Sequence, residues 1–316
     1  MSADDSPGRN RGAALKTPDI LVLGAGGILG EAWTSSLLAG LSENGSFDAR
    51  GCDALIGTSA GSIVAAMLCG GVEPSSRVED LPEQPPVAES EQVQETPFAR
   101  ALRSAATLGG AVTGPLASVV LHTTVPGGRL LRREGLRRVR RGRRSLEGLG
   151  RQIEESGVEW DGRLRIAVVE LETGRRVMLD GSQPGWSVSD AVQASCAIPG
   201  VFRPIERNGH SYVDGGAWSV SNLDTAPVEK GTDVLCLNPT ASLSSGRSAP
   251  MSLLGRVSRS VANVEAASVR RRGATVRVIS PDAQAAALMG PNLMREGPHD
   301  DVLAAGLAQG RRLAAT

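Results

Sequence analysis

Two short glycine-rich motifs carry the residues of this chain that are best suited to chemistry. Ser59 is the central residue of Gly57–Gly61, which reads Gly-Thr-Ser-Ala-Gly. This is the pattern of a sharp turn that holds a serine hydroxyl out beyond the end of a sheet. Asp214 is followed by two glycines, which suits a carboxylate presented into a cleft and equally suits an ordinary Asp-Gly turn. The first motif predicts a nucleophile for acyl transfer, and the second is a candidate for its partner.

The residues around Ser59 predict a strand, a turn and a helix in that order. The apolar run Ala54–Ile56 fits a buried strand, and Ser62–Cys69 fits a helix that ends at two glycines. The same order occurs earlier, because the apolar run Ile20–Leu23 enters a glycine-rich turn and then a helical stretch from Glu31 to about Asn44. Ser59 is therefore expected at a helix N-terminus, where free N–H groups favour developing negative charge. Two such units in succession predict a parallel α/β sheet with helices on its faces.

The second half of the chain returns to short strands and helices. Asn208-Gly209 is a strong hairpin turn signal, and the strand Ser211–Val213 after it presents Asp214. The other predicted elements are a helix over Leu146–Glu155, a hairpin of Leu164–Glu170 with Arg175–Leu179, a short helix capped by Ser189, strands at Val234–Leu237 and Thr275–Ile279 separated by a helix over Met251–Arg272, and a terminal helix over Asp300–Ala315.

Composition indicates a globular protein and gives no reason to expect nucleic acid as a partner. The chain has 316 residues, 41% of them hydrophobic and 22% charged, with a formal net charge of zero at pH 7. Met1–Thr17 is polar, and we expect it to be disordered; because it lacks an apolar stretch, it does not have the pattern of a signal peptide. No run approaches the ~18 apolar residues that a membrane span needs, and a cytoplasmic location is the expectation.

The stretch between about Val72 and Arg144 interrupts the alternation of strands and helices. Its first part is rich in proline and acidic residues, which predicts a flexible insertion. Arg129–Arg144 is rich in arginine with leucine and valine interspersed, which fits either a solvated helix face or a surface facing lipid headgroups. We expect this region, about 72–144, to form a helical or irregular cap that shapes substrate entry, with peripheral membrane contact as a candidate role of its arginines.

Cysteine and histidine give no metal-binding pattern. Cys52, Cys69, Cys196 and Cys236 are widely spaced in apolar or small-residue contexts, which predicts buried free thiols. The chain has only three histidines, so a histidine-rich metal site is not expected.

Taken together, the motifs resemble those of the patatin-like phospholipase family. The resemblance rests on the glycine-rich turn Gly24–Gly30, the Ser59 turn, the Asp214 motif and, shortly before it, Ala197–Phe202. It covers roughly 19–224 without the insertion. It implies a three-layer α/β/α sandwich with a mostly parallel central sheet, a single domain over 18–316, and a Ser–Asp dyad that hydrolyses acyl esters of lipids without metal or cofactor.

The resemblance gives roles to residues of this sequence. Ser59 would carry the acyl group, Asp214 would act as the general base, and the N–H groups of Gly26, Gly27 and Ala60 would meet the oxyanion. Because a carboxylate near its ordinary pKa is a poor base, we predict a partly apolar site that raises the pKa of Asp214. The expected activity is that of a serine hydrolase acting on carboxylic ester bonds, of phospholipase A or lysophospholipase/carboxylesterase type. The glycines that support the motifs are Gly24, Gly30, Gly57, Gly61, Gly215 and Gly216.

One position departs from the family pattern. The family's turn usually reads Gly-Gly-x-Arg/Lys-Gly, and here Leu29 stands at the basic position. Main-chain donors do not depend on that side chain, so the departure bears on phospholipid preference rather than on hydrolysis. Neutral lipid esters, thioesters and small acyl esters stay open as substrates.

Three alternatives follow from the same residues. Ile20–Gly30 has the strand, glycine turn and helix of a dinucleotide-binding module, but the third fingerprint glycine falls on Leu29. The chain order Ser59, Asp214, His299 fits a Ser-His-Asp esterase, although His299 reads more as the entry to the last helix. A non-catalytic lipid- or nucleotide-binding protein of the same fold is the third.

Overall fold

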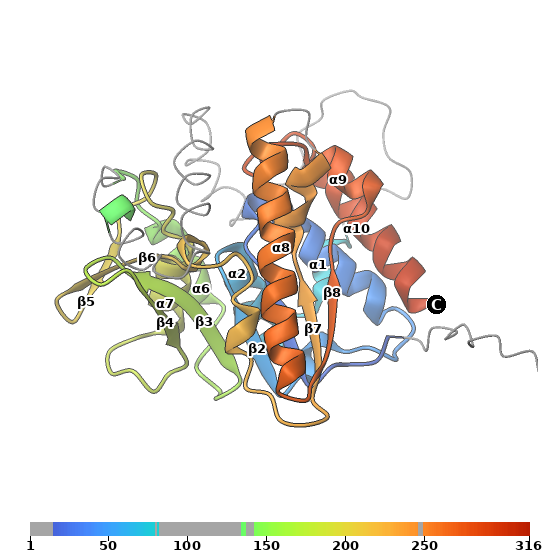
Figure 1. Ribbon diagram of the computed structural model, residues 1–316, viewed down its shortest axis with the longest axis horizontal. Helices are drawn as coiled ribbons and strands as arrows, with labels where there is room; N and C mark the ends of the chain where they lie inside the picture. The colour runs from blue at the N-terminus through green and yellow to red at the C-terminus, as the bar shows by residue number, and fades with distance from the viewer. Residues whose placement is uncertain (1–14, 80, 82–133, 137–141, 246–248) are drawn as a thin grey trace, which may run out of the picture.

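A computed structural model describes residues 15–79, 81, 134–136, 142–245 and 249–316 (Figure 1). Most of the predicted cap region, most of Arg129–Arg144 and the first fourteen residues lie outside the described residues. The prediction of disorder through Thr17 is wrong at its end. Leu15 is buried against the core, and the Thr17 hydroxyl accepts a hydrogen bond from the N–H of Asp48 at 2.8 Å.

The centre of the described structure is one eight-stranded sheet in the order β5-β6-β3-β2-β1-β7-β8, with β4 also paired to β3. β3, β2, β1, β7 and β8 run parallel, whereas β4 and β6 are antiparallel to β3, and β5 and β6 form a hairpin. The strands are β1 Ile20–Leu23, β2 Ala54–Gly57, β3 Leu164–Glu170, β4 Arg175–Leu179, β5 Ile205–Arg207, β6 His210–Asp214, β7 Asp233–Leu237 and β8 Thr275–Ile279.

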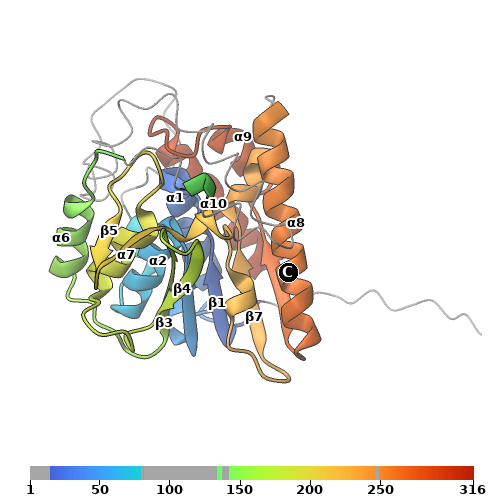
Figure 2. The same cartoon turned by 60° about the vertical axis from the view of Figure 1, so that its left-hand side comes forward.

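Helices cover both faces of this sheet, which confirms the predicted three-layer α/β/α class (Figure 2). α8 packs on one face, and α1, α2, α6, α7, α9 and α10 pack on the other. The α-helices are α1 Gly27–Ser42, α2 Ala60–Cys69, α6 Glu147–Glu155, α7 Val188–Cys196, α8 Ala249–Arg271, α9 Ala283–Met289 and α10 His299–Ala314.

Side-chain alternation along the central strands divides the core into two layers. In β1, Leu21 and Leu23 belong to the larger apolar cluster under α1 and α2, while Ile20 and Val22 belong to the cluster under α8. Successive strand residues point to opposite faces, so a strand buried on both sides is apolar throughout. This is why the predicted short apolar runs, Ile20–Leu23 and Ala54–Ile56, were reliable signals for β1 and β2.

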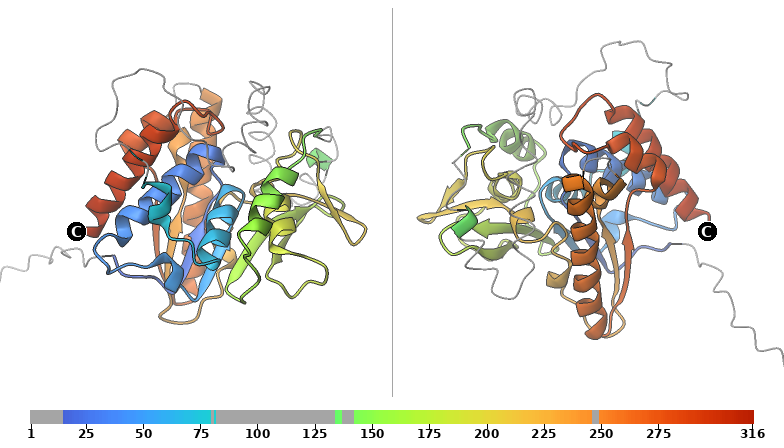
Figure 3. Two further views of the ribbon diagram at one scale, coloured as in Figure 1. Left: turned by 180° about the vertical axis from the view of Figure 1, so that it is seen from behind. Right: turned by 45° about the horizontal axis from the view of Figure 1, so that its top comes forward.

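α1 and α10 lie side by side on the larger cluster (Figure 3). The indole N–H of Trp33 donates to Oε1 of Gln309 at 2.9 Å, and both side chains are buried. This hydrogen bond ties the middle of α1 to α10.

β2 and β6 meet end to end along one edge of β3. β4 pairs with Ile166 to Glu170 on one edge of β3, so β2 and β6 must share the other edge. On that edge Gly57 of β2 lies opposite Ile166, and Asp214 of β6 lies opposite Val168. Because the two strands run in opposite directions, their carboxyl ends point at each other across Ala167, and the two motifs are brought together.

The predicted strands and hairpins are confirmed, and the helix starts need correction. α1 begins at Gly27 rather than Glu31, and α2 begins at Ala60 rather than Ser62. Neither helix has a side-chain cap at its start, so the usual N-cap signal is missing. The short helix α7 is capped by the Ser187 hydroxyl, which accepts from the N–H of Asp190, and not by Ser189.

Candidate active site

Ser59 occupies a strained turn between β2 and α2. Its backbone angles are φ 53° and ψ −125°, a left-handed φ that costs a residue with a Cβ of order 1–3 kcal/mol and is typical of functional sites. Gly61 permits this turn, because a Cβ at that position would collide with the carbonyl of Leu23. The first turn of α2 therefore rests directly on the end of β1, beside the glycine-rich turn.

The backbone of Ser59 is held by a hydroxyl from α7. The N–H of Ser59 donates to Oγ of Ser195 at 2.9 Å, and that hydroxyl donates to the carbonyl of Ala167 at 2.8 Å. Ser195 is fully buried. Ser195 was not among the predicted site residues, and the predicted short helix ended one residue before it, at Ala194, whereas α7 continues to Cys196.

Asp214 lies at the end of β6 with its carboxyl group facing the Ser59 hydroxyl. The Ser59 hydroxyl is near enough to lower the pKa of this carboxyl group, and the N–H of Gly216 donates to Asp214 Oδ1 at 2.7 Å. The N–H of Asp214 donates to the carbonyl of Ala197 at 3.0 Å. Ala197–Phe202, one of the motifs of the family resemblance, thus begins at the residue whose carbonyl holds the backbone of Asp214.

Burial raises the pKa of Asp214 to about 7, while the hydrogen bonds from Ser59 and Gly216 act in the opposite direction. Only 4% of the residue is exposed. Removing a carboxylate from water disfavours its charged form, and two donors are not enough to offset this. A base with a pKa near neutrality is better matched to accepting a serine proton than an ordinary aspartate is.

The glycine-rich turn leaves backbone donors free beside Ser59. The N–H groups of Gly24, Leu29 and Gly30 donate to protein carbonyls. Among the described residues, those of Gly26, Gly27 and Ala60 have no protein acceptor. Free N–H groups at the starts of α1 and α2 can donate to an anion.

Solvent contact at this pair is small in the described structure. Ser59 is 7% exposed. A cavity of about 90 Å³ lies near α2, bounded by residues of α1, α2 and α6 that include Glu31, Ile63 and Ile153, and neither Ser59 nor Asp214 lines it. This cavity is therefore not the cleft expected at the Ser59–Asp214 pair.

A model of the patatin-like phospholipase family matches residues 21–227. The match spans more than half of the 316 residues and includes the glycine-rich turn, the Ser59 turn and the Asp214 motif. The chain belongs to the patatin-like phospholipase family. Membership places it among lipid-ester hydrolases, and it accounts for the glycine turn on which the dinucleotide-binding alternative relied.

Two solved structures are similar to this patatin-like chain at low identity. VipD from Legionella pneumophila aligns with a TM-score of 0.43 and 14% identity, over 96% of this chain and 67% of that one. The type III effector protein ExoU aligns with a TM-score of 0.35 and 16% identity, over 96% of this chain and 53% of that one. The chain thus spans about half the length of ExoU, and we rest no argument on either likeness.

The position that departs from the family pattern is part of the core. Leu29 is fully buried in the larger apolar cluster, and its N–H donates to the carbonyl of Leu293 at 3.0 Å. An arginine or lysine at this position would have to bury its charge. The apolar residue therefore fits the packing of this chain.

The two histidines with ionic contacts do not bond the Ser59–Asp214 pair. His299 starts α10, and its Nδ1 lies 3.0 Å from Oδ1 of Asp300. His210 lies at the far end of β6 from Asp214 and pairs with Glu170 at 3.3 Å. Within the described residues, the carboxylate of Asp214 accepts a hydrogen bond from the N–H of Gly216, and the side chain that lowers its pKa is Ser59.

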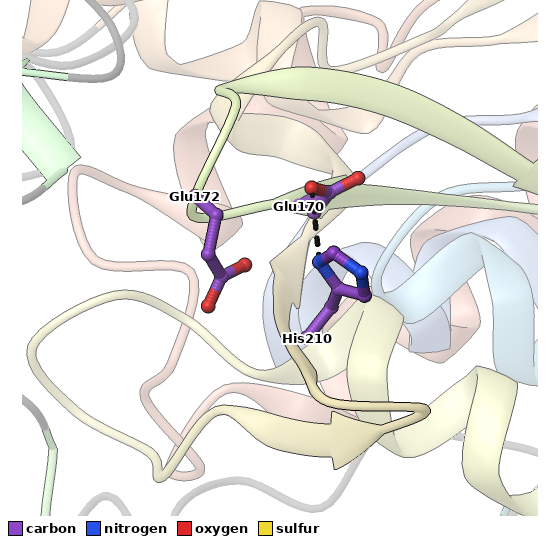
Figure 4. A group of neighbouring side chains, drawn as sticks. All are labelled: Glu170, Glu172 and His210. Atoms are coloured by element: carbon purple, nitrogen blue, oxygen red, sulfur yellow. Dashed lines mark ion pairs between the residues drawn. The ribbon is translucent and has the colours of Figure 1, made fainter.

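Within the described part of the chain, one group of three side chains has donor atoms of the kind that metal ions bind. These atoms of Glu170, Glu172 and His210 lie within 4.8 Å of one another (Figure 4). His210 and Glu172 are exposed, and the Glu172 carboxylate already accepts from the N–H of Ser211 at 3.2 Å. We interpret the group as an ion-pair cluster at the surface.

The four cysteines are free, as predicted, and Cys69 is only partly buried. Burial raises the pKa of the Cys52 and Cys69 thiols to about 12, which makes them poor nucleophiles. None of the helices that the structure describes has the length and apolar character to cross a bilayer.

Proposed function

We propose that this protein is a lipid acyl hydrolase, of phospholipase A or lysophospholipase/carboxylesterase type, that uses Ser59 and Asp214 as a catalytic dyad. The observation that carries the proposal is that the Ser59 turn and Asp214 meet at the junction of β2 and β6, where the Ser59 hydroxyl lowers the pKa of the Asp214 carboxyl group. The strained backbone of Ser59 supports it, because such strain persists only where the surrounding structure enforces it.

Acylation begins when Oγ of Ser59 attacks the ester carbonyl carbon and the carboxylate of Asp214 takes the hydroxyl proton. The carbonyl oxygen becomes an oxyanion, which accepts hydrogen bonds from the N–H groups of Gly26, Gly27 and Ala60. The tetrahedral intermediate then expels the alcohol, and Asp214 returns the proton to it. The product of this half-reaction is an acyl ester on Ser59.

Deacylation repeats the same proton transfers with water. Asp214 takes a proton from a water molecule as its oxygen attacks the acyl carbon, and the oxyanion again accepts from the free backbone N–H groups. Collapse of the intermediate releases the carboxylic acid and returns the proton to Ser59. No atom of a metal or cofactor enters either half-reaction.

Substrate preference is expected to follow from the apolar residue at position 29. Without a cation there, the turn offers no fixed charge to an anionic headgroup, so neutral lipid esters should be hydrolysed at least as well as anionic phospholipids. Membrane contact through Arg129–Arg144 is a separate proposal, tested by co-sedimentation with vesicles that contain or lack anionic lipid. Equal binding to both kinds of vesicle would contradict an electrostatic role for these arginines.

The test of the function is turnover of a panel of p-nitrophenyl esters, phospholipids, lysophospholipids and acyl-thioesters. We expect hydrolysis of at least one lipid ester, with kcat/KM lowered at least ~10³-fold in Ser59→Ala and in Asp214→Asn. Turnover of no member of the panel, or turnover that persists in Ser59→Ala, would contradict the proposal.

A further inference from the structure

A buried carboxylate on α8 lies behind the candidate active site. Glu265 is 9% exposed, although it occupies the apolar face of the helix between Ala262, Ala266 and Val269. Its Oε2 accepts a hydrogen bond from the Ser221 hydroxyl at 2.6 Å and from the N–H of Leu223 at 3.0 Å. Burying a carboxylate costs free energy unless hydrogen-bond donors satisfy it. The residues that donate to Glu265 therefore indicate its role.

The partners of Glu265 belong to Ser219–Leu223, which we call the linking segment. Within it, the Ser219 hydroxyl accepts from the N–H of Ser221 at 3.3 Å and from the N–H of Asn222 at 3.1 Å. Asn222 adopts a left-handed φ of 51° and is completely buried. A strained, buried residue needs a surrounding structure that enforces its conformation, and the bonds on either side of Asn222 go to Glu265.

The linking segment contacts all three motifs of the candidate active site. Nδ2 of Asn222 donates to Oγ1 of Thr58, the residue before the nucleophile, at 3.0 Å. It also lies 3.5 Å from the carbonyl of Gly215, the residue after Asp214. The carbonyl of Val220 accepts from the N–H of Ala25, in the glycine-rich turn, at 2.7 Å.

We infer that Glu265 is a positioning residue that holds the linking segment in register with the nucleophile turn, the aspartate motif and the glycine-rich turn. It touches none of the reacting atoms itself. The inference rests on the proposed function, since the three motifs are taken there as the catalytic parts. Loss of Glu265 releases the hydroxyl of Ser221 and the N–H of Leu223 and lets Asn222 move away from Thr58.

The other groups near Glu265 also support a role in holding the linking segment in position. Burial, and then the nearby charge of Asp224, raise the pKa of Glu265 to about 7. Asp224 is itself paired with Arg176 at 2.6 and 2.8 Å, and Arg176 also donates to Oδ1 of Asn222 at 3.1 Å. The linking segment is thus held from the sheet side by an arginine and from the helix side by Glu265.

The experiment compares Glu265→Ala and Glu265→Gln with the wild type in ester hydrolysis, at a temperature where thermal unfolding shows each variant folded. We expect Glu265→Ala to lower kcat at least tenfold with KM changed less than threefold. We expect Glu265→Gln, which keeps an acceptor oxygen, to recover most of this loss. Ser221→Ala, which removes one donor only, should give an intermediate kcat and decides the matter if Glu265→Ala does not fold.

The matched control is Gln309→Ala. Gln309 is a buried polar residue that likewise has several hydrogen-bond partners (Trp33, Asp282 and Ser280), but it belongs to α10 and bonds none of the three motifs. It should lower the melting temperature without lowering kcat. If the wild type is active, two results overturn this inference alone. One is an unchanged kcat in Glu265→Ala, and the other is a loss of kcat in Gln309→Ala equal to that in Glu265→Ala. A wild type with no Ser59-dependent turnover overturns the proposed function and this inference with it.

Discussion

Asp214 combines three properties that are seldom found together in one side chain. It is almost fully enclosed by protein, its carboxyl group lies near the Ser59 hydroxyl, and burial raises its pKa to about 7. Burial and hydrogen bonding oppose each other here, and burial has the larger effect. The same balance determines both the activity and the stability that we expect at different pH values.

The first prediction concerns the pH dependence of activity. Only the ionised form of Asp214 can take the Ser59 proton, so kcat/KM should rise about tenfold per pH unit below pH 7 and level off above it. The measurement is p-nitrophenyl ester hydrolysis from pH 5 to 9. A rate that stays constant down to pH 5 would show that the base has an ordinary aspartate pKa.

The second prediction concerns stability. With a pKa of about 7 in the folded state and an ordinary value of 3.8 for an unfolded chain, Asp214 binds more protons in the folded state than in the unfolded state between these two pH values. Stability from this group therefore falls as pH rises through that window and is constant above it. Asp214→Asn removes the cost of the buried charge, so it should be more stable than the wild type at pH 8 by up to a few kcal/mol.

The extra stability of Asp214→Asn over the wild type should be smaller at pH 5, where the Asp214 carboxyl group of the wild type is mostly protonated. Urea unfolding of both proteins at the two pH values measures it. Because Glu265 is present in both proteins, its own raised pKa cancels in the comparison. Equal stability of the two proteins at pH 8 would contradict a buried, ionised Asp214.

At the scale of elements, the site is made where strand ends and helix starts come together. β2 supplies the turn with Ser59, β6 ends in Asp214, and α7 places Ser195 under both, on the carbonyl of Ala167. A Cβ on Gly215 would strike this same carbonyl. Ala167, at the gap between β2 and β6 on the edge of β3, is therefore the point on which both motifs rest.

The third prediction tests this arrangement through Ser195→Ala. The N–H of Ser59 would lose its acceptor, which should destabilise the fold by about 1–3 kcal/mol and lower kcat by loosening the turn. Thermal unfolding and ester turnover measure the two effects. The matched control is Ser42→Ala, because the Ser42 hydroxyl also donates to a carbonyl, that of Leu38 in α1, at 3.0 Å.

The control should keep the wild-type kcat. If Ser195→Ala keeps it as well, the hydroxyl has no part in holding the nucleophile turn.

Local sequence was sufficient to predict most of the helices and strands, but it was insufficient to predict several of the contacts between them. The apolar runs of β1 and β2 and the Asn208-Gly209 turn are signals written within a few residues, and each was predicted correctly. Ser195 and Glu265 act on partners far away in the chain, which periodicity does not encode. Glu265 could nevertheless have been noticed in the sequence, because a glutamate on the apolar face of a predicted helix indicates a buried charge that needs partners.

At the scale of the whole molecule, the decisive feature is the order of the strands. The sequence predicts a parallel sheet, but only the fold shows that β6 enters antiparallel on the same edge of β3 as β2. That arrangement joins residues 59 and 214 and places His210 at the opposite end of β6. The family resemblance implied a Ser–Asp dyad, and the strand order is the physical reason why these two residues lie at one place.

The fourth prediction is that His299→Ala leaves kcat within about twofold of the wild type. His299 starts α10, and its ring contacts Asp300 rather than either member of the dyad. Steady-state ester hydrolysis measures the effect. A loss of 100-fold or more would transfer the base role to His299 and revive the Ser-His-Asp alternative.

The most direct test of the dyad is covalent labelling with a fluorophosphonate, located by peptide mass spectrometry. We predict a single adduct on Ser59, no adduct in Ser59→Ala, and labelling slowed at least ~10²-fold in Asp214→Asn, because the hydroxyl then lacks its base. An adduct on another residue, or labelling of Ser59 at the wild-type rate in Asp214→Asn, would contradict the account.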